Sequence, residues 1–191
     1  MRLLEKKILE EGKVLDGGIL KVDGFLNHLV DVPFSTLLGK EIYEHFKDSG
    51  INKILTVESS GIGLACLTAQ YFNCPVLIGK KSKSLNISSD VYTAKVYSFT
   101  HKTENNIVVS KEYLHSGDKV LIIDDFLANG NACVGLVDII KQAGAEVKGI
   151  SCAVEKTYQG GYQKLVDMGI DVYSLARIKD MKDGKIYFVE D

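Results

Sequence analysis

The sequence predicts an α/β fold in which a mainly parallel sheet is flanked by helices. Residues 120–140 run from a β-branched apolar stretch through two aspartates and a short loop into a helical pattern. An apolar run without polar interruption is typical of a strand buried on both faces, and strand, loop and helix make half of a βαβ unit. Residues 51–71 repeat this order. Since 191 residues provide one substantial core, we expect a single domain over residues 1–191.

Periodicity and helix-end signals place the other elements in chain order. A first helix is expected over residues 2–11, before Gly12. Residues 19–29 mix a short strand with an Asp23-Gly24 turn. A second helix begins at Pro33, a residue suited to the first helical turn. It should run to residue 48. Further helices are expected over residues 64–71, from 132 to before Gly144, and over 161–168. Strands are expected over residues 51–57, 75–79, 91–99, 107–110, 119–123, 146–155, 172–178 and 185–189.

Composition excludes several broad classes of function. The net charge is −2, with 23 basic and 25 acidic residues, so bulk charge gives no reason to expect a nucleic-acid partner. The start of the chain has no apolar segment of a signal peptide, and no run approaches the ~20 apolar residues of a membrane span. We therefore expect a cytoplasmic protein without a membrane partner. The cysteines lack metal-ligand spacing and are expected to be buried reduced thiols: Cys66, Cys74, Cys133 and Cys152.

The stretch V-L-I-I-D-D-F-L-A-N-G-N-A, residues 120–132, predicts a ligand site. In open α/β sheets ligands bind beyond the carboxyl ends of the strands, so Asp124 and Asp125 should lie at the mouth of a pocket. The loop after the strand is expected over residues 126–130. The amides of residues 128–132 then open a helix, whose N-terminus favours phosphate, and Gly130 permits a positive φ. A ribose 5-phosphate satisfies both halves of this site; alternatively, Asp125 only caps the loop.

A second strand–turn–helix segment predicts another anion site on the same sheet edge. The turn Glu58-Ser59-Ser60-Gly61-Ile62-Gly63 follows the strand expected over 51–57. It is too short for a dinucleotide fingerprint, because the third glycine is absent. The alternative is an ordinary helix start with Ser59 or Ser60 as N-cap.

Residues 120–132 resemble the PRPP (5-phosphoribosyl 1-diphosphate) signature of type I phosphoribosyltransferases. That signature is an apolar strand, two acids, two mostly apolar residues, and then a small-residue loop ending in glycine, here Ala128, Asn129 and Gly130. Hypoxanthine-guanine members carry an acid where Ala128 stands, so an acid/base role at this position does not carry over. Asn129 replaces the usual threonine. The resemblance extends over nearly the whole chain to the bacterial xanthine-specific members. It implies transfer of the phosphoribosyl group from PRPP to xanthine in purine salvage, a homodimer, and an N-terminal hood formed by residues 1–32.

The resemblance also implies a role for each part of the site. Asp124 and Asp125 would serve the ribose and its environment. A flexible loop from Lys80 to about Tyr97 would close over PRPP, with Lys81 assigned to the leaving diphosphate. Mg²⁺ would be bound mainly through PRPP and pyrophosphate, without a dedicated metal site of protein ligands. The remaining assignments are Ala128, Asn129, Gly130, Asn131 and Ala132 to the 5′-phosphate, Glu58, Ser59, Ser60 and Gly61 to the pyrophosphate, and Leu20, Asn27, Lys156, Phe126 and Leu127 to xanthine.

Lys156 discriminates best between possible bases. It falls at the carboxyl end of an expected strand, and an ammonium has only donors, so it favours a 6-oxo group over a 6-amino group. From residue types alone, Lys156 would be a solvated lysine, Leu20 a core residue and Asn27 a turn former. Two other functions stay open: a guanine or hypoxanthine phosphoribosyltransferase, and a regulator that senses PRPP without catalysis.

Overall fold

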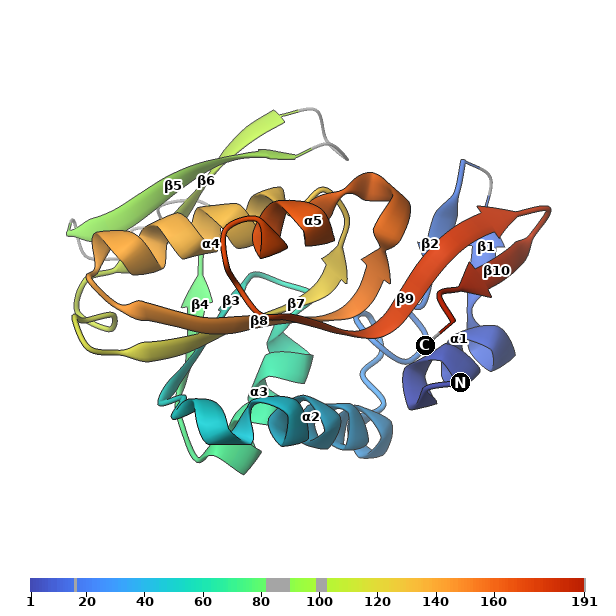
Figure 1. The fold of residues 1–191 in the computed structure, drawn as a ribbon, viewed down its shortest axis with the longest axis horizontal. Helices are drawn as coiled ribbons and strands as arrows, with labels where there is room; N and C mark the ends of the chain where they lie inside the picture. The colour runs from blue at the N-terminus through green and yellow to red at the C-terminus, as the bar shows by residue number, and fades with distance from the viewer. Residues whose placement is uncertain (16, 82–89, 99–102, 191) are drawn as a thin grey trace.

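The computed structural model describes the chain except for residues 16, 82–89, 99–102 and 191 (Figure 1). Its centre is a six-stranded sheet with the order β10-β9-β8-β7-β3-β4. Neighbours pair in parallel from β4 to β9, and β10 pairs antiparallel with β9. The predicted mainly parallel sheet is therefore confirmed. The strands are β3 Lys53–Val57, β4 Val76–Gly79, β7 Lys119–Leu127, β8 Glu146–Lys156, β9 Val172–Lys182 and β10 Lys185–Phe188.

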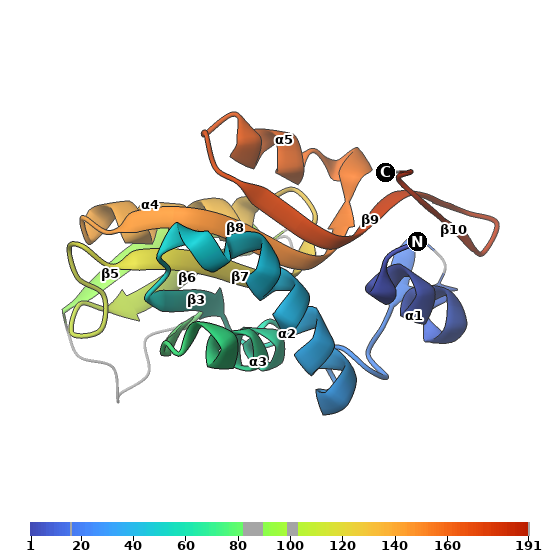
Figure 2. The same cartoon turned by 60° about the horizontal axis from the view of Figure 1, so that its bottom comes forward.

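Helices cover both faces of the sheet (Figure 2). On one face, α2 Val32–Phe46 and α3 Ile62–Phe72 pack with sheet residues into one apolar cluster. On the other face, α4 Asn131–Gln142 forms a second cluster, which also includes residues of the hairpin β5 Val91–Ser98 and β6 Thr103–Ser110. These two layers explain why the central strands read as continuous apolar runs.

The N-terminal segment lies beside the β9–β10 end of the sheet (Figures 1 and 2). It contains α1 Leu3–Glu11 and a small antiparallel pair, β1 Lys13–Leu15 and β2 Ile19–Lys21. Strand β1 was not expected from the sequence. The remaining short helices are η1 Lys47–Ser49, η2 Thr157–Gln159 and α5 Gly161–Val166.

Strand β7 is longer than predicted. It was expected to end at residue 123, but it continues through both aspartates to Leu127 because β8 pairs with it as far as Leu127 opposite Glu155. The predicted loop over residues 126–130 is thus reduced to 128–130, and α4 begins at Asn131. A tertiary partner, rather than the local sequence, sets this strand end.

Three other expectations are wrong in part. Cys66 is exposed and Cys74 half-buried, whereas Cys133 and Cys152 are buried; all four are free thiols. The loop predicted from Lys80 to Tyr97 ends earlier, because Val91–Ser98 is strand β5; its residues 82–89 lie outside the described residues. Helix α3 has Gly61 as N-cap without a side-chain hydrogen bond, so neither Ser59 nor Ser60 caps it.

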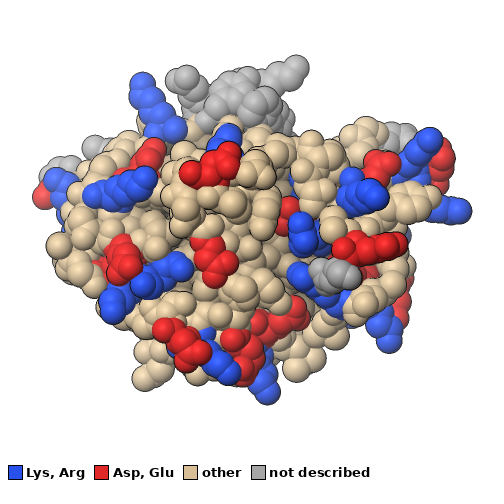
Figure 3. All heavy atoms as spheres, viewed as in Figure 1, with Lys and Arg blue, Asp and Glu red and all other residues tan. Residues whose placement is uncertain are grey.

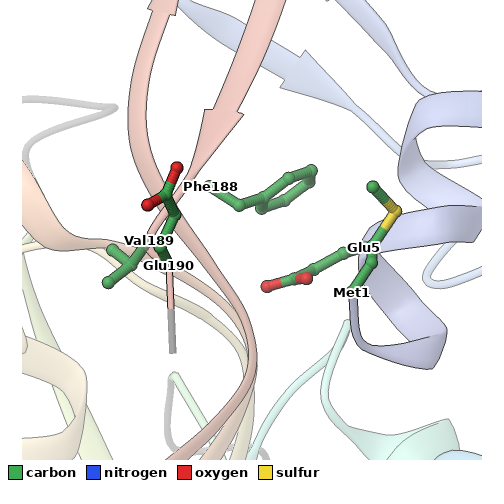
Figure 4. A pocket seen from close by; sticks show the side chains of 5 residues that line it. All are labelled: Met1, Glu5, Phe188, Val189 and Glu190. Carbon is green, nitrogen blue, oxygen red and sulfur yellow. The ribbon is translucent and has the colours of Figure 1, made fainter.

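The surface adds two observations. Basic and acidic side chains are interspersed on the face shown in Figure 3 and do not form a patch of one sign there. A cavity of about 330 Å³ lies between the chain ends, and the Phe188 ring points from β10 toward Met1 and Glu5 (Figure 4). Since β9 and β8 separate β10 from β7, this cavity is not part of the predicted site.

Within the described residues, no helix is long and apolar enough to cross a membrane.

Candidate active site

Two aspartates occupy the carboxyl-terminal part of β7. Asp124 is 7% exposed, and its Oδ1 accepts a hydrogen bond from the Asp125 backbone N–H at 2.9 Å. Burial, and then the neighbouring charge of Asp125, raises the pKa of Asp124 well above its ordinary value. Asp125 is half-buried. The pair therefore presents one buried carboxyl group that resists ionisation and one more accessible carboxyl group.

The loop after β7 has the geometry of an anion cradle. Gly130 adopts a φ of 75°, as predicted, and is the N-cap of α4. The Gly130 N-cap provides no side-chain hydrogen bond to the helix, and the N-terminus of a helix favours an anion. Within the loop, Asn129 Oδ1 accepts a hydrogen bond from Asn131 N–H at 3.2 Å.

The turn after β3, which is the second predicted anion site, lies against Asp124. A Cβ atom placed on Gly61 would lie 3.3 Å from Asp124 Cα and 2.6 Å from Thr56 Oγ1. Only glycine permits this close approach of the turn after β3 to β7. The Glu58–Ser59 peptide in this turn is cis. The turn after β3 thus lies against Asp124, and the loop after β7 begins three residues beyond Asp125.

Glu58 faces lysines rather than an anion. Its carboxylate accepts a hydrogen bond from Lys81 N–H at 2.7 Å, and Lys80 Nζ lies 3.1 Å from its other oxygen. The hydrogen bond from Lys81 is the main reason that the pKa of Glu58 lies below its ordinary value. The Glu58 side chain therefore anchors the residues that lead into the lysine-rich segment, and the positive charge of Lys81 acts on Asp124.

The N-terminal segment contacts the strand ends through two polar side chains. Asn27 Nδ2 donates to Asp125 Oδ2 at 2.9 Å. Lys156, at the end of β8, donates to the Gly18 carbonyl at 3.2 Å. Burial lowers the pKa of the half-buried Lys156 ammonium below its ordinary value. Residues far apart in the sequence thus meet at the edge where β7 and β8 end.

The apolar residues assigned to the base separate into two groups. Leu20 is 7% exposed and shares one cluster with the partly buried Phe126. Leu127 is 1% exposed and belongs to the cluster beneath α4. The structure therefore brings Leu20 and Phe126 to the side of the N-terminal segment and places Leu127 in the other core cluster.

Sequence reasoning missed several polar residues around this edge. Thr56 Oγ1 is buried beneath Gly61 without a hydrogen-bond partner, and Lys164 of α5 donates to the cradle loop. The buried Glu155 carboxylate lies 3.6 Å from Arg177 Nε. Only Glu155, next to Lys156 at a strand end, carried a positional signal, because a lone threonine or a lysine on a short helix is usually structural or solvated.

The chain belongs to the phosphoribosyltransferase family. A family model described as phosphoribosyl transferase domain matches residues 35–181. The chain is 51% identical over 190 residues to xanthine phosphoribosyltransferase of Ruminiclostridium cellulolyticum, covering 100% of both proteins. It is also 51% identical over 189 residues to xanthine phosphoribosyltransferase 2 of Clostridium botulinum, covering 98% of this chain and 100% of that protein.

Solved structures with the same fold are more distant in sequence. Adenine phosphoribosyltransferase of Giardia lamblia, bound to 9-deazaadenine, superposes with a TM-score of 0.77 at 20% identity, covering 92% of this chain and 97% of that one. The adenine enzyme of Rhodothermus marinus gives a TM-score of 0.76 at 21% identity, covering 91% and 97%. At this identity the likeness establishes the fold alone and has no bearing on the base.

Proposed function

We propose that this chain transfers the 5-phosphoribosyl group from PRPP to xanthine, giving xanthosine 5′-monophosphate and pyrophosphate in purine salvage. The observation that carries the proposal is Lys156, a half-buried donor held against the N-terminal segment at the end of β8, the strand that pairs with β7. A buried ammonium without a hydrogen-bond acceptor is unfavourable. The Lys156 ammonium therefore favours binding of a purine with a 6-oxo group, which accepts a hydrogen bond, over one with a 6-amino group. The xanthine enzymes at 51% identity support the same base.

The two anion cradles would position PRPP. Residues 128–132 hold the 5′-phosphate, the turn from Glu58 to Gly61 holds the diphosphate through its backbone, and Asp125 accepts from the ribose hydroxyls. The bond between ribose C1 and the diphosphate oxygen breaks, and its electron pair leaves with the diphosphate. A purine nitrogen that has lost its proton to solvent bonds to C1, through an oxocarbenium-like transition state. Positioning of two reactants supplies roughly 7–11 kcal/mol of such a barrier. Lys81 stabilises the charge that develops on the departing diphosphate.

Residues 1–32 would form a hood over the base. In the described structure, the Asn27 amide already donates to Asp125, and Lys156 donates to Gly18. Both donors would turn to the purine when it binds, with Asn27 beside the 2-position and Lys156 at O6. Leu20 and Phe126 supply the apolar wall on this side. Leu127 supports that wall from the opposite core cluster.

Mg²⁺ would enter with PRPP. Among the described residues, no group of three or more His, Cys, Asp or Glu side chains is arranged to hold a metal ion. Mg²⁺ keeps several waters and can take its other ligands from the substrate, so it does not require a dedicated cluster of protein side chains. When bound, Mg²⁺ neutralises charge on the diphosphate. Asp125 would supply the more accessible carboxyl group near the ribose, and Asp124 the buried one beside it.

Pyrophosphate release with PRPP and Mg²⁺, measured in parallel with xanthine, guanine, hypoxanthine, adenine and orotate, tests the proposal. Strongest turnover with xanthine is expected. Lys156→Ala should raise the KM for xanthine, whereas Lys148→Ala, at the far end of the same strand, should leave it unchanged. Turnover with another base would overturn the choice of xanthine. PRPP binding without turnover of any base would favour a sensor.

The family resemblance also supports a cytoplasmic homodimer with small-molecule substrates and no nucleic-acid partner. Light scattering at micromolar concentration should give twice the 21.0 kDa chain mass. A monomer under these conditions would contradict the dimer.

A further inference from the structure

The cradle loop after β7 is held from outside by α5. The Gly161 backbone N–H donates to the Ala128 carbonyl at 3.0 Å. The Lys164 ammonium donates to the Asn129 carbonyl at 2.9 Å and to Asn131 Oδ1 at 3.0 Å. These bonds link a helix more than thirty residues downstream to the loop. No part of the proposed reaction requires Lys164 to touch a substrate.

The loop and α5 approach each other at backbone distance. A Cβ atom on Gly161 would collide with the Ala128 carbonyl oxygen and lie 2.7 Å from Gly130 N. Helix α5 is in turn anchored in the core by Leu165, which is fully buried. The loop therefore rests on a fixed neighbour.

The bonded carbonyls determine where the loop amides point. In a trans peptide unit, the N–H lies on the opposite side from the C=O. Because the Ala128 carbonyl faces Gly161, the Asn129 N–H of the same peptide unit points away from α5. The Asn129 carbonyl faces Lys164, so the Gly130 N–H points away from Lys164 in the same manner. Two of the amides assigned to the 5′-phosphate are thus oriented by α5.

We propose that Lys164 is a positioning residue for the 5′-phosphate of PRPP. Its ammonium holds the Asn129 carbonyl and the Asn131 side chain, and thereby keeps the loop amides directed at the phosphate. This inference rests on the proposed function. Because Lys164 is exposed, solvent screens its charge, and its main contribution is orientation rather than direct attraction.

The test compares Lys164→Met, which keeps most of the apolar stem, with Lys164→Arg, which keeps the donors. Lys141→Met removes the same charge from the last turn of α4 and is the matched control. We expect Lys164→Met to raise the KM for PRPP by about threefold to thirtyfold, with kcat and the KM for xanthine little changed. Lys164→Arg should recover most of the loss, and Lys141→Met should show none.

Direct binding separates this inference from the reaction itself. Lys164→Met should weaken binding of ribose 5-phosphate by the same factor as PRPP, and leave pyrophosphate binding unchanged. Equal binding of ribose 5-phosphate by Lys164→Met and the unmodified protein would overturn the inference. So would parallel losses for pyrophosphate, xanthine and PRPP with a lower Tm, since they indicate a general structural role. If xanthine is not turned over but ribose 5-phosphate binding depends on Lys164, the proposed reaction fails and the positioning role stands. If the unmodified protein does not bind ribose 5-phosphate, both the proposed reaction and the positioning role are refuted.

Discussion

Replacement of Gly161 by alanine tests how closely α5 controls the cradle loop. The backbone of Gly161 is not in the left-handed region, so alanine causes no φ strain there. Its methyl group would lie 2.7 Å from Gly130 N and 3.0 Å from the Asn129 carbonyl carbon. Ordinary contacts begin at 3.4 Å, and the Ala128 carbonyl oxygen would lie closer to the methyl group than Gly130 N does. The loop must therefore shift by more than about 0.7 Å relative to α5.

Both stability and PRPP use should respond to this shift. Overpacking of this kind costs about 1–3 kcal/mol of folding free energy. In a domain of this size, each kcal/mol lowers Tm by about 2–4 °C. A misplacement approaching 1 Å costs about a hundredfold in rate, so we expect kcat/KM for PRPP to fall by about tenfold to a hundredfold.

Gly169→Ala is the matched control. Gly169 has a φ of +77° and nothing within 4 Å of its missing Cβ. Alanine there costs about 1–2 kcal/mol of backbone strain without contact with the cradle. Thermal unfolding and initial rates at varied PRPP should show a similar loss of stability in both variants and a loss of PRPP use in Gly161→Ala alone. Wild-type kinetics for Gly161→Ala, with its Tm lowered, would refute the reasoning.

Three further predictions concern the titratable and polar groups of the site. The pKa of Asp124 is raised in the folded state, so the stability that its protonated form provides at low pH is lost as the pH rises through that pKa. Asp124→Asn should therefore raise Tm more at alkaline than at acidic pH. An equal change in Tm at all pH values would contradict this. Because the pKa of Lys156 is lowered, the KM for xanthine should begin to rise at a pH below the ordinary lysine value of 10.5. This rise of KM at alkaline pH should disappear in Lys156→Arg. An unchanged rise in Lys156→Arg would assign the titration to another group. Asn27→Ala removes the amide that donates to Asp125 in this structure and would turn to the purine when it binds. The KM for xanthine should therefore rise by about tenfold, the value of one good hydrogen bond, while a rise only in the KM for PRPP would place Asn27 outside the base site.

Local patterns were sufficient for most of the sheet. The apolar runs that became β3, β7 and β8 were identified because both faces of each strand are covered by helices. The positive φ of Gly130 was also anticipated from the loop that contains it. The ends of two strands were exceptions. Strand β9 runs to Lys182 rather than to residue 178, and at the end of β7 the polar pair Asp124-Asp125 reads as a strand terminus. Pairing with β8 extends the strand past them.

The sequence by itself determined the local motif that runs from β7 into α4. The order of apolar strand, paired acids, small-residue loop and helix is local, and hydrophobic burial and helix-end geometry act over a few residues.

Tertiary structure alone decided which distant residues meet at the candidate site. The contacts of Asn27 with Asp125, Lys156 with Gly18, and Lys164 with the cradle loop span 98, 138 and about 35 residues of sequence. Such pairings depend on how the N-terminal segment and α5 dock on the sheet, and docking follows from packing over the whole core. No local pattern encodes them, which is why a lysine on a short helix carried no signal until the fold placed it on the loop.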